Sequence, residues 1–268
     1  MRKKANGKWH NKISISFIVL LVFIAVLVTS INACGFFFGG STSWKEEVLL
    51  HDGTKIVIKR FYDLGGKREL DSQEQRNLEE TVTFTMPGMN KEITWKTDFR
   101  DEKPAPNSLD LLALDIVNGT PYIATNPRGC ISYNKWKRPN PPYIFFKYDG
   151  NVWQRISLEE FPAEISKVNV IVERPPAALQ KSFYTVEQVK ERNRNLREEI
   201  FKTIVRTPLE ESALCPEEIK DGKGTWYGIN WFSDQPSYEA CLSFCKKNQI
   251  SGKDCPCDRL FKTNKKEK

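Results

Sequence analysis

A run of 19 uncharged residues near the N-terminus, 13–31, constrains this chain most, because such a run does not fold into an ordinary soluble domain. At a rise of about 1.5 Å per residue, a helix of this length just crosses a hydrocarbon core of about 30 Å. The residues before it carry five Lys or Arg and no acid, and such basic flanks stay in the cytoplasm. We therefore expect a signal or membrane helix within an N-terminal region 1–33, and export of the rest of the chain.

The end of this segment, Ile31-Asn32-Ala33-Cys34, resembles the lipobox of bacterial lipoproteins. The resemblance implies that Cys34 becomes a lipidated N-terminus. Asn32 departs from the small or aliphatic residue usual at its position, and the apolar run is longer than the roughly 7 to 15 residues of a cleaved signal. An uncleaved signal anchor is the alternative. Both predict a membrane partner, a short tether at 34–43 and a main domain on the periplasmic or extracellular side.

Six further cysteines agree with export, because an even number in an exported chain is typical of disulfides. They are Cys130, Cys215, Cys241, Cys245, Cys255 and Cys257. Five of them lie in 210–258, which predicts a small module that burial alone would not stabilise. Cys255 and Cys257 are too close to pair easily with each other, so each should pair with an earlier cysteine of the module. The odd number in the module also predicts one bond to Cys130.

A metal site is the alternative for the same module. Cys241-x3-Cys245 and Cys255-x-Cys257 together supply four thiolates, the number that a structural zinc needs. Cys-x-Cys is an unusual ligand spacing, and export removes the reducing conditions that keep thiols free. We expect disulfides, no metal and no cofactor, with a helix after Pro236 and Ser237 that places Cys241 and Cys245 one turn apart.

The region 44–209 contains short apolar–polar alternations joined by tight turns. Asp52-Gly53 is a typical two-residue hairpin turn, and Asn118-Gly119 favours a strand end after 109–117, although that run also fits a helical pattern. We expect strands at 46–51, 54–61, 81–86, 92–97, 109–117, 122–125, 143–148, 152–156 and 168–172. This pattern predicts a mainly β (α+β) fold, an antiparallel sandwich or barrel-like domain. One amphipathic helix is expected at 186–205, with Thr185 and Gln188 as its capping box.

Charge argues against nucleic acid as a partner. The formal net charge of +7 comes from the N-terminal region and a basic tail at 259–268, whereas 34–258 carries 31 basic and 33 acidic residues. A domain that neutralises many phosphates needs a basic face, which such an even mixture does not predict.

Catalytic signals are weak. The chain has two histidines, His10 before the membrane segment and His51 beside the Asp52-Gly53 turn, and it has no G-x-S-x-G or H-E-x-x-H motif. His51 is expected to be a surface turn residue, so we predict no catalytic residue and regard enzymatic activity as uncertain.

Aromatic and basic residues cluster around a proline-rich loop. Candidate contacts to a sugar, a peptide or an acidic polymer are Tyr133, Trp136, Arg138, Tyr143 and Trp153. The alternative is that the tryptophans fill the core and the prolines only shape a long loop.

From Trp44 to about Arg206 the chain resembles an uncharacterised family of bacterial membrane-anchored, lipoprotein-like envelope proteins, most clearly at 132–136, 138–143, 145–150 and 153–156. The resemblance implies export and a shared β-rich domain, and no activity. The sequence thus predicts a non-catalytic, membrane-tethered cell-envelope protein whose β-domain binds another envelope protein or a glycan, or supports structure. An exported hydrolase with an unrecognised active site is the alternative.

Overall fold

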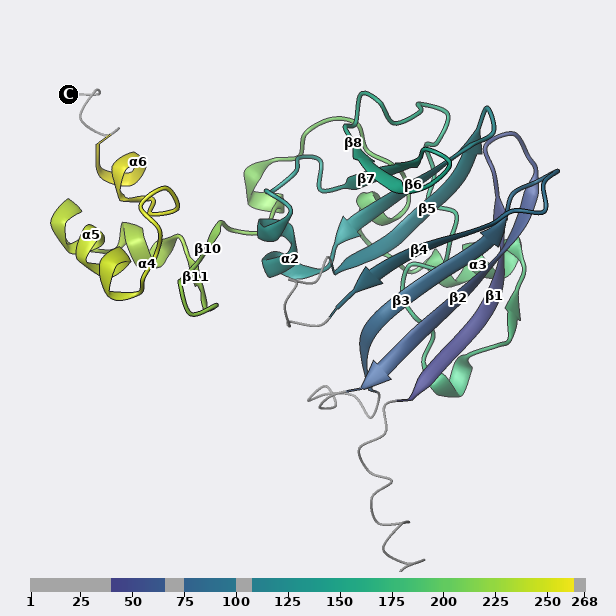
Figure 1. The fold of residues 1–268 in the computed structure, drawn as a ribbon, viewed down its shortest axis with the longest axis horizontal. Helices are drawn as coiled ribbons and strands as arrows, with labels where there is room; N and C mark the ends of the chain where they lie inside the picture. The colour runs from purple at the N-terminus through teal and green to yellow at the C-terminus, as the bar shows by residue number, and fades with distance from the viewer. Residues whose placement is uncertain (1–39, 66–74, 100–107, 263–268) are drawn as a thin grey trace, which may run out of the picture. The chain divides into compact units, whose positions relative to one another are not determined.

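The computed structural model describes residues 40–65, 75–99 and 108–262 (Figure 1). The predicted membrane segment 13–31 and Cys34 lie outside these residues, as do most of the tether and the last six residues of the basic tail. No helix of the described part is long and apolar enough to cross a membrane. Ser41–Lys268 forms a compact unit separate from Met1–Gly40.

The first sheet has five strands in the order β4-β3-β2-β1-β9. They are β1 (Ser41–Leu49), β2 (Lys55–Gly65), β3 (Arg76–Thr85), β4 (Glu92–Asp98) and β9 (Phe183–Tyr184). The first four are antiparallel neighbours and β9 runs parallel to β1. The predicted hairpin joins β1 and β2, but its loop has three residues (51–53), not two. The Leu50 N–H donates to the Thr54 carbonyl at 2.8 Å, the Gly53 N–H donates to the Leu50 carbonyl at 3.0 Å, and in this loop Gly53 alone adopts a positive φ, of +87°.

The second sheet has four antiparallel strands in chain order. They are β5 (Leu109–Val117), β6 (Thr120–Pro127), β7 (Ile144–Tyr148) and β8 (Trp153–Ile156). The strand prediction for 109–117 is confirmed, and Asn118 and Gly119 both adopt positive φ in the turn that follows. A short helix, α2 (Gly129–Lys135), separates β6 from β7.

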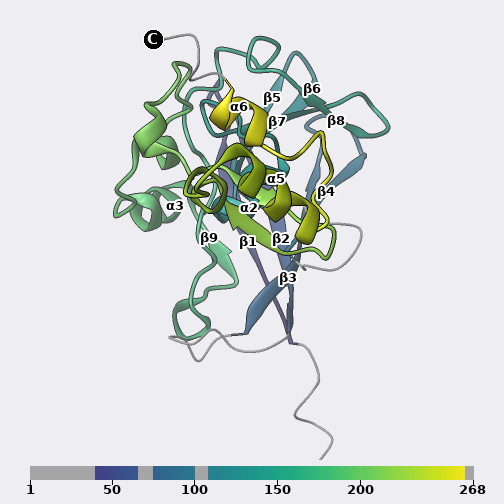
Figure 2. The ribbon, with the colours of Figure 1, turned by 90° about the vertical axis from the view of Figure 1, so that its left-hand side faces the viewer.

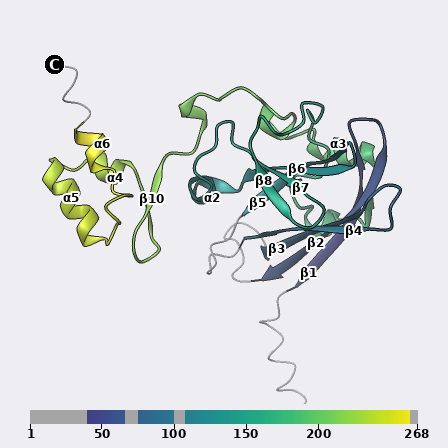
Figure 3. The same ribbon diagram turned by 45° about the horizontal axis from the view of Figure 1, so that its top comes forward.

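The two sheets pack as layers of a sandwich (Figure 3), which confirms the predicted fold class. Alternate residues of each strand point into the shared core, as expected for strands with one buried face. Val48, Ile58, Val82 and Phe84 come from the first sheet, and Leu111, Leu114, Ile123 and Ile144 from the second. The other face of the second sheet is covered by residues of the following segment, including Phe161, Ile165 and Ile204.

A buried ionic cluster lies on the first sheet. The Arg60 guanidinium donates to carboxylate oxygens of Glu46 (3.1 Å) and Glu80, to the Tyr62 hydroxyl (2.8 Å) and to the Ile171 carbonyl (2.9 Å). Arg60, Glu46 and Glu80 are fully buried. Burial raises the pKa of Glu46, against the opposing charge of Arg60.

The predicted helix at 186–205 is too long. Helix α3 (Val186–Asn193) begins at the expected capping box and ends at Asn193, whose amide donates to the Val170 carbonyl and accepts from the Val172 N–H. After a short 3-10 turn, η3 (Glu199–Phe201), the Ile204 N–H donates to the Ser166 carbonyl. Packing against the covering segment therefore overrides the helical pattern beyond Asn193.

The predicted strand at 168–172 is also wrong. A single bridge, Lys167 to Thr203, forms there, and the side chain of Asn169 bonds to β5. The Asn169 side chain occupies the Leu114 N–H and carbonyl of β5, which a paired strand would otherwise use. Two further 3-10 turns are η2 (Ala177–Leu179), which precedes β9, and η4 (Glu211–Ala213), which precedes the C-terminal module.

The C-terminal module, which faces the viewer in Figure 2, has its own small core around buried cysteines. Its elements are β10 (Glu218–Lys220), β11 (Trp226–Gly228), α4 (Asn230–Ser233), α5 (Tyr238–Lys247) and α6 (Cys257–Phe261). As predicted, a helix begins after Ser237, whose hydroxyl accepts the Ala240 N–H. The module is joined to the β-domain through α2, where the Asn134 side chain bonds both to the Pro216 carbonyl and to the Glu218 N–H.

Candidate functional site

A buried carboxylate holds His51. The His51 ring nitrogen Nδ1 lies 2.8 Å from Asp115 Oδ1, and the backbone N–H of His51 donates to Asp115 Oδ2 at 2.9 Å. Asp115, on β5, is 2% exposed, whereas the His51 side chain is 24% exposed. Because the His51 ring and backbone bind the same carboxylate, the β1–β2 turn is fixed against the second sheet. The other ring nitrogen, Nε2, makes no hydrogen bond to the described residues, so it can bind a further partner.

The charge of His51 follows from this contact. The hydrogen bond that the His51 ring donates to the Asp115 carboxylate raises the pKa of His51 most, and the charges of Asp115, Asp52 and Glu164 raise it further. Burial opposes these effects. His51 therefore keeps its positive charge to a higher pH than a free histidine.

A cavity of about 610 Å³ adjoins this His51–Asp115 pair. Its walls come from the end of β1, from β5, from the loop 164–169, from α3 and from the end of η3. Apolar residues make up one part of the lining: Leu49, Leu50, Ile165, Val168, Val186, Val189 and Phe201. The volume is in the range of small-molecule sites, and a largely apolar lining with a few polar groups is typical of them.

Two asparagines fix the shape of this cavity. The Asn169 amide donates to the carbonyls of Leu49 (3.1 Å) and Leu114 (2.9 Å), and its oxygen accepts the Leu114 N–H. Asn193 bonds in the same way to the segment after Asn169. The loop, α3 and both sheets are therefore tied together beside the cavity, which is formed without a ligand.

Basic residues line the rim. Lys167, Lys190 and Lys202 are exposed, and none of them forms an ion pair with a carboxylate of the described residues. Arg194 lies on the same rim but pairs with Glu191 at 2.8 Å. Glu164 is the one carboxylate among the described lining residues besides Asp115. With His51 charged, the rim is therefore net positive.

The sequence placed His51 on a surface turn but did not identify Asp115, which lies 64 residues later in the chain. One signal was present, since Asp110 and Asp115 are isolated acids inside the otherwise apolar run 109–117. A carboxylate in such a strand needs a partner when it is buried.

Asp110 lines a second cavity, of about 760 Å³, between the two sheets' ends and the segment after residue 172. Burial raises the pKa of Asp110 from 3.8 to about 6, although the Arg128 guanidinium, at 3.8 Å, lowers it. The raised pKa means that the folded protein disfavours the ionised form of Asp110 relative to the protonated form, more than water does.

Replacing Asp110 by asparagine should therefore change the pH dependence of stability. A carboxyl whose folded pKa lies above its unfolded pKa stabilises the protein below about pH 4 relative to higher pH, and this stability is lost as the pH rises through about 6. We expect D110N to be more stable than the parent by about 2 kcal/mol at pH 7.5 and equally stable at pH 4, by urea unfolding. The exposed Asp254, replaced in the same way, is the control. Parallel pH profiles of D110N and the parent would contradict this account.

None of the five predicted ligand contacts lines either of the two cavities described above. Tyr143 is buried in the second core, and its hydroxyl donates to the Thr203 carbonyl at 3.0 Å. Trp136 and Trp153 pack against the first core. The Arg138 guanidinium lies 5.6 Å from the ring centre of the buried Tyr133 and donates to the Cys215 carbonyl. These residues therefore contribute packing and join the module to the β-domain.

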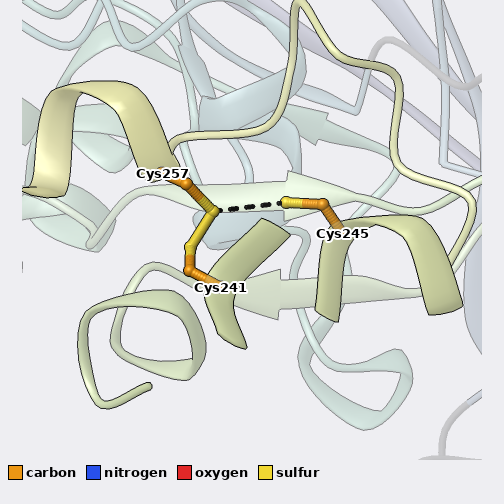
Figure 4. Close-up of side chains that lie close together, drawn as sticks. All are labelled: Cys241, Cys245 and Cys257. Atoms are coloured by element: carbon orange, nitrogen blue, oxygen red, sulfur yellow. Dashed lines mark hydrogen bonds between the residues drawn. A yellow bond between two sulfur atoms is a disulfide. The ribbon is translucent and has the colours of Figure 1, made fainter. Parts of the chain in front are cut away.

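All six predicted disulfide cysteines are paired, as Cys130–Cys215, Cys241–Cys257 and Cys245–Cys255. The prediction that Cys130 pairs with a cysteine of the module is confirmed, as is the prediction that Cys255 and Cys257 pair with earlier ones. Cys245 Sγ lies only 3.7 Å from Cys257 Sγ (Figure 4). The sulfurs of Cys241, Cys245 and Cys257 all lie within 4.8 Å of one another, close enough for metal ligands, but in this structure they are held in disulfides.

The cavity beside His51 is thus the candidate site, and its residues come from 49–51, 115 and 164–202. The resemblance to bacterial envelope proteins remains a prediction. No protein-family model, curated protein or solved structure matches the chain.

Proposed function

We propose that this chain is a non-catalytic, membrane-tethered envelope protein whose exported β-domain binds a small molecule in the cavity beside His51. The observation that carries the proposal is the cavity itself, which is preformed, partly apolar and bordered by a fixed His51–Asp115 pair. Sites for small molecules have this combination of an apolar lining and a few placed polar groups. The three disulfides agree with an oxidising compartment.

Binding of a neutral apolar dye tests the cavity. Ser41–Lys268 is a compact unit with its own cores and disulfides, so it can be used without the segment 13–31. We expect Nile red to gain fluorescence on binding it, and we expect Ser166→Trp, which places an indole at the cavity lining, to reduce the binding at least about tenfold. Ser251→Trp, at an exposed position in the module, is the matched control. Equal binding by the parent and S166W would place the dye elsewhere and contradict the proposal.

A hydrolase is the second candidate, and the His51–Asp115 pair favours it. A carboxylate that orients a histidine ring is the arrangement of a general base. Within the described residues, however, no hydroxyl or thiol hydrogen-bonds to His51, and the cysteines are all in disulfides. Water would have to be the nucleophile. Hydrolysis of a p-nitrophenyl ester that is lost in H51Q would support the hydrolase over the binding protein.

The tether belongs to the proposal as well. If Cys34 is lipidated, the parent should incorporate labelled fatty acid and Cys34→Ala should not, because the thiol of that residue is the acceptor. An unlabelled parent of unchanged size would instead establish the uncleaved anchor. A reporter fused after Lys268 should be active only outside the cytoplasm in either case.

A further inference from the structure

We propose that the ligand of the cavity beside His51 is a single-chain amphiphile with an anionic head group. This inference rests on the proposed binding function and adds the class of ligand. The head would lie against His51 and the lysine rim, defined as Lys167, Lys190 and Lys202, and the chain against the apolar wall.

The charges of the site are the first argument. The lysine rim and His51 supply up to four positive charges, and the carboxylates of Asp115 and Glu164 offset two of them. The Asp115 carboxylate is already used, because it accepts from both the His51 ring and the His51 backbone. Among the described residues, no carboxylate forms an ion pair with a lysine of the rim, although the charge of Glu187 acts on Lys190 from a greater distance. A ligand carboxylate could therefore contact these lysines directly.

The apolar wall is the second argument. Leu49, Val168 and Phe201 line the same cavity as the lysine rim and are only partly buried, so they still have apolar surface that a ligand could cover. A small inorganic anion would leave this wall in contact with water. An aliphatic chain would cover it and gain the free energy of apolar burial while its head stays at the charged rim. A neutral lipid or alcohol would in turn leave the positive charges without a partner.

The position of His51 adds a pH dependence. The groups that face its ring are Asp115 on β5, Asp52 in the turn and Glu164 in the loop, and all three favour its charged form. As the pH rises through its raised pKa, His51 loses its positive charge while the lysine rim keeps its own. Affinity for the anion should therefore fall at alkaline pH, by the contribution of one charge.

Octanoate and 1-octanol separate the charge of the head from the apolar chain. Titration calorimetry of Ser41–Lys268 at pH 6.5 should show octanoate binding at least about tenfold more tightly than 1-octanol, although the alcohol has the head group that is easier to transfer from water. In the variant with Lys167→Gln, Lys190→Gln and Lys202→Gln, the order should reverse. Lys246→Gln, Lys247→Gln and Lys253→Gln, three exposed lysines of the module, make the same change in net charge and should leave the order unchanged.

The His51 contribution has its own measurement. Octanoate affinity of the parent should fall several-fold between pH 6.5 and pH 9, and this fall should be absent in H51Q. Octanol that binds as tightly as octanoate to the parent would overturn the anionic class while leaving the binding function intact. Failure of both ligands and of Nile red to bind would overturn the proposed function itself.

Discussion

Replacing Arg60 by methionine should lower the free energy of unfolding by roughly 3 to 5 kcal/mol, because it leaves two buried carboxylates without their cation. Glu46 and Glu80 are both fully buried and both accept from Arg60. The methionine keeps much of the volume, so the loss reports the charge and not a cavity. Urea unfolding followed by tryptophan fluorescence measures it, and Trp44 stacks on Tyr62 beside the cluster.

Two controls make this result specific. Lys59→Met removes a cation from the adjacent, exposed position of β2 and should change stability by no more than about 0.5 kcal/mol. Adding E46Q and E80Q to R60M should recover part of the loss, because the remaining groups are neutral. The loss in R60M should also be smaller at pH 4.5 than at pH 7.5, because burial raises the pKa of Glu46 and a protonated Glu46 no longer needs the cation. If R60M and the parent had the same free energy of unfolding, water would have to reach the carboxylates of Glu46 and Glu80, and the account of a buried ionic cluster would be wrong.

Removing one disulfide of the module should unfold the module and leave the β-domain folded. The variant C241A/C257A opens a link between residues 16 apart in sequence, a loss of about 3 kcal/mol. Apart from the cysteines, only Ile219, Phe232 and Ile250 are buried in the module core, and the other apolar side chains that pack there are partly exposed. Hydrogen exchange should show lost protection in α5 and α6 and unchanged protection in β1 to β7.

Ser243→Ala, an exposed change on α5, is the control for this variant. Protection of α5 that survives in C241A/C257A would contradict the disulfide account of the module. Thiol titration of the unfolded, unreduced parent should find no free thiol among the six cysteines. Four free thiols together with one bound zinc would replace the two module disulfides by a metal site.

The sequence predicted those parts of the fold that depend on residues close together in the chain, such as turns and hairpins. Gly53, Asn118 and Gly119 adopt positive φ, which Gly and Asn tolerate, so these residue types predict turns at both places. The run 109–117 looked partly helical because β5 contains an irregularity between Leu111 and Ala113, which shifts the alternation by one residue and buries apolar side chains on both faces. The length of α3 was overestimated because Ile200 and Ile204 have helical spacing. In the structure Ile200 lies in the separate 3-10 turn η3 and Ile204 in irregular backbone, and both pack on the second sheet.

The candidate site could not be assembled from the sequence for a similar reason. His51 and Asp115 come from different sheets, and the cavity beside them needs the loop at 164–169 to be held by Asn169 across 55 residues of chain. No pattern of sequence spacing predicts that these segments meet in the folded protein. The aromatic cluster drew attention because tryptophan and tyrosine are common in binding sites, but they are equally common in cores, where four of those rings contribute packing here.

The bond between Cys130 and Cys215 spans 85 positions and makes the chain between them a covalently closed loop. That loop contains β7, β8, β9, α3 and most of the lining of the cavity beside His51. A protease that cuts one peptide bond anywhere in 131–214, including the exposed stretch before η4, releases no fragment, because the sulfur bridge still connects both sides of the cut. In a compartment rich in proteases, the module stays attached after a nick that would shed it from an unbridged chain.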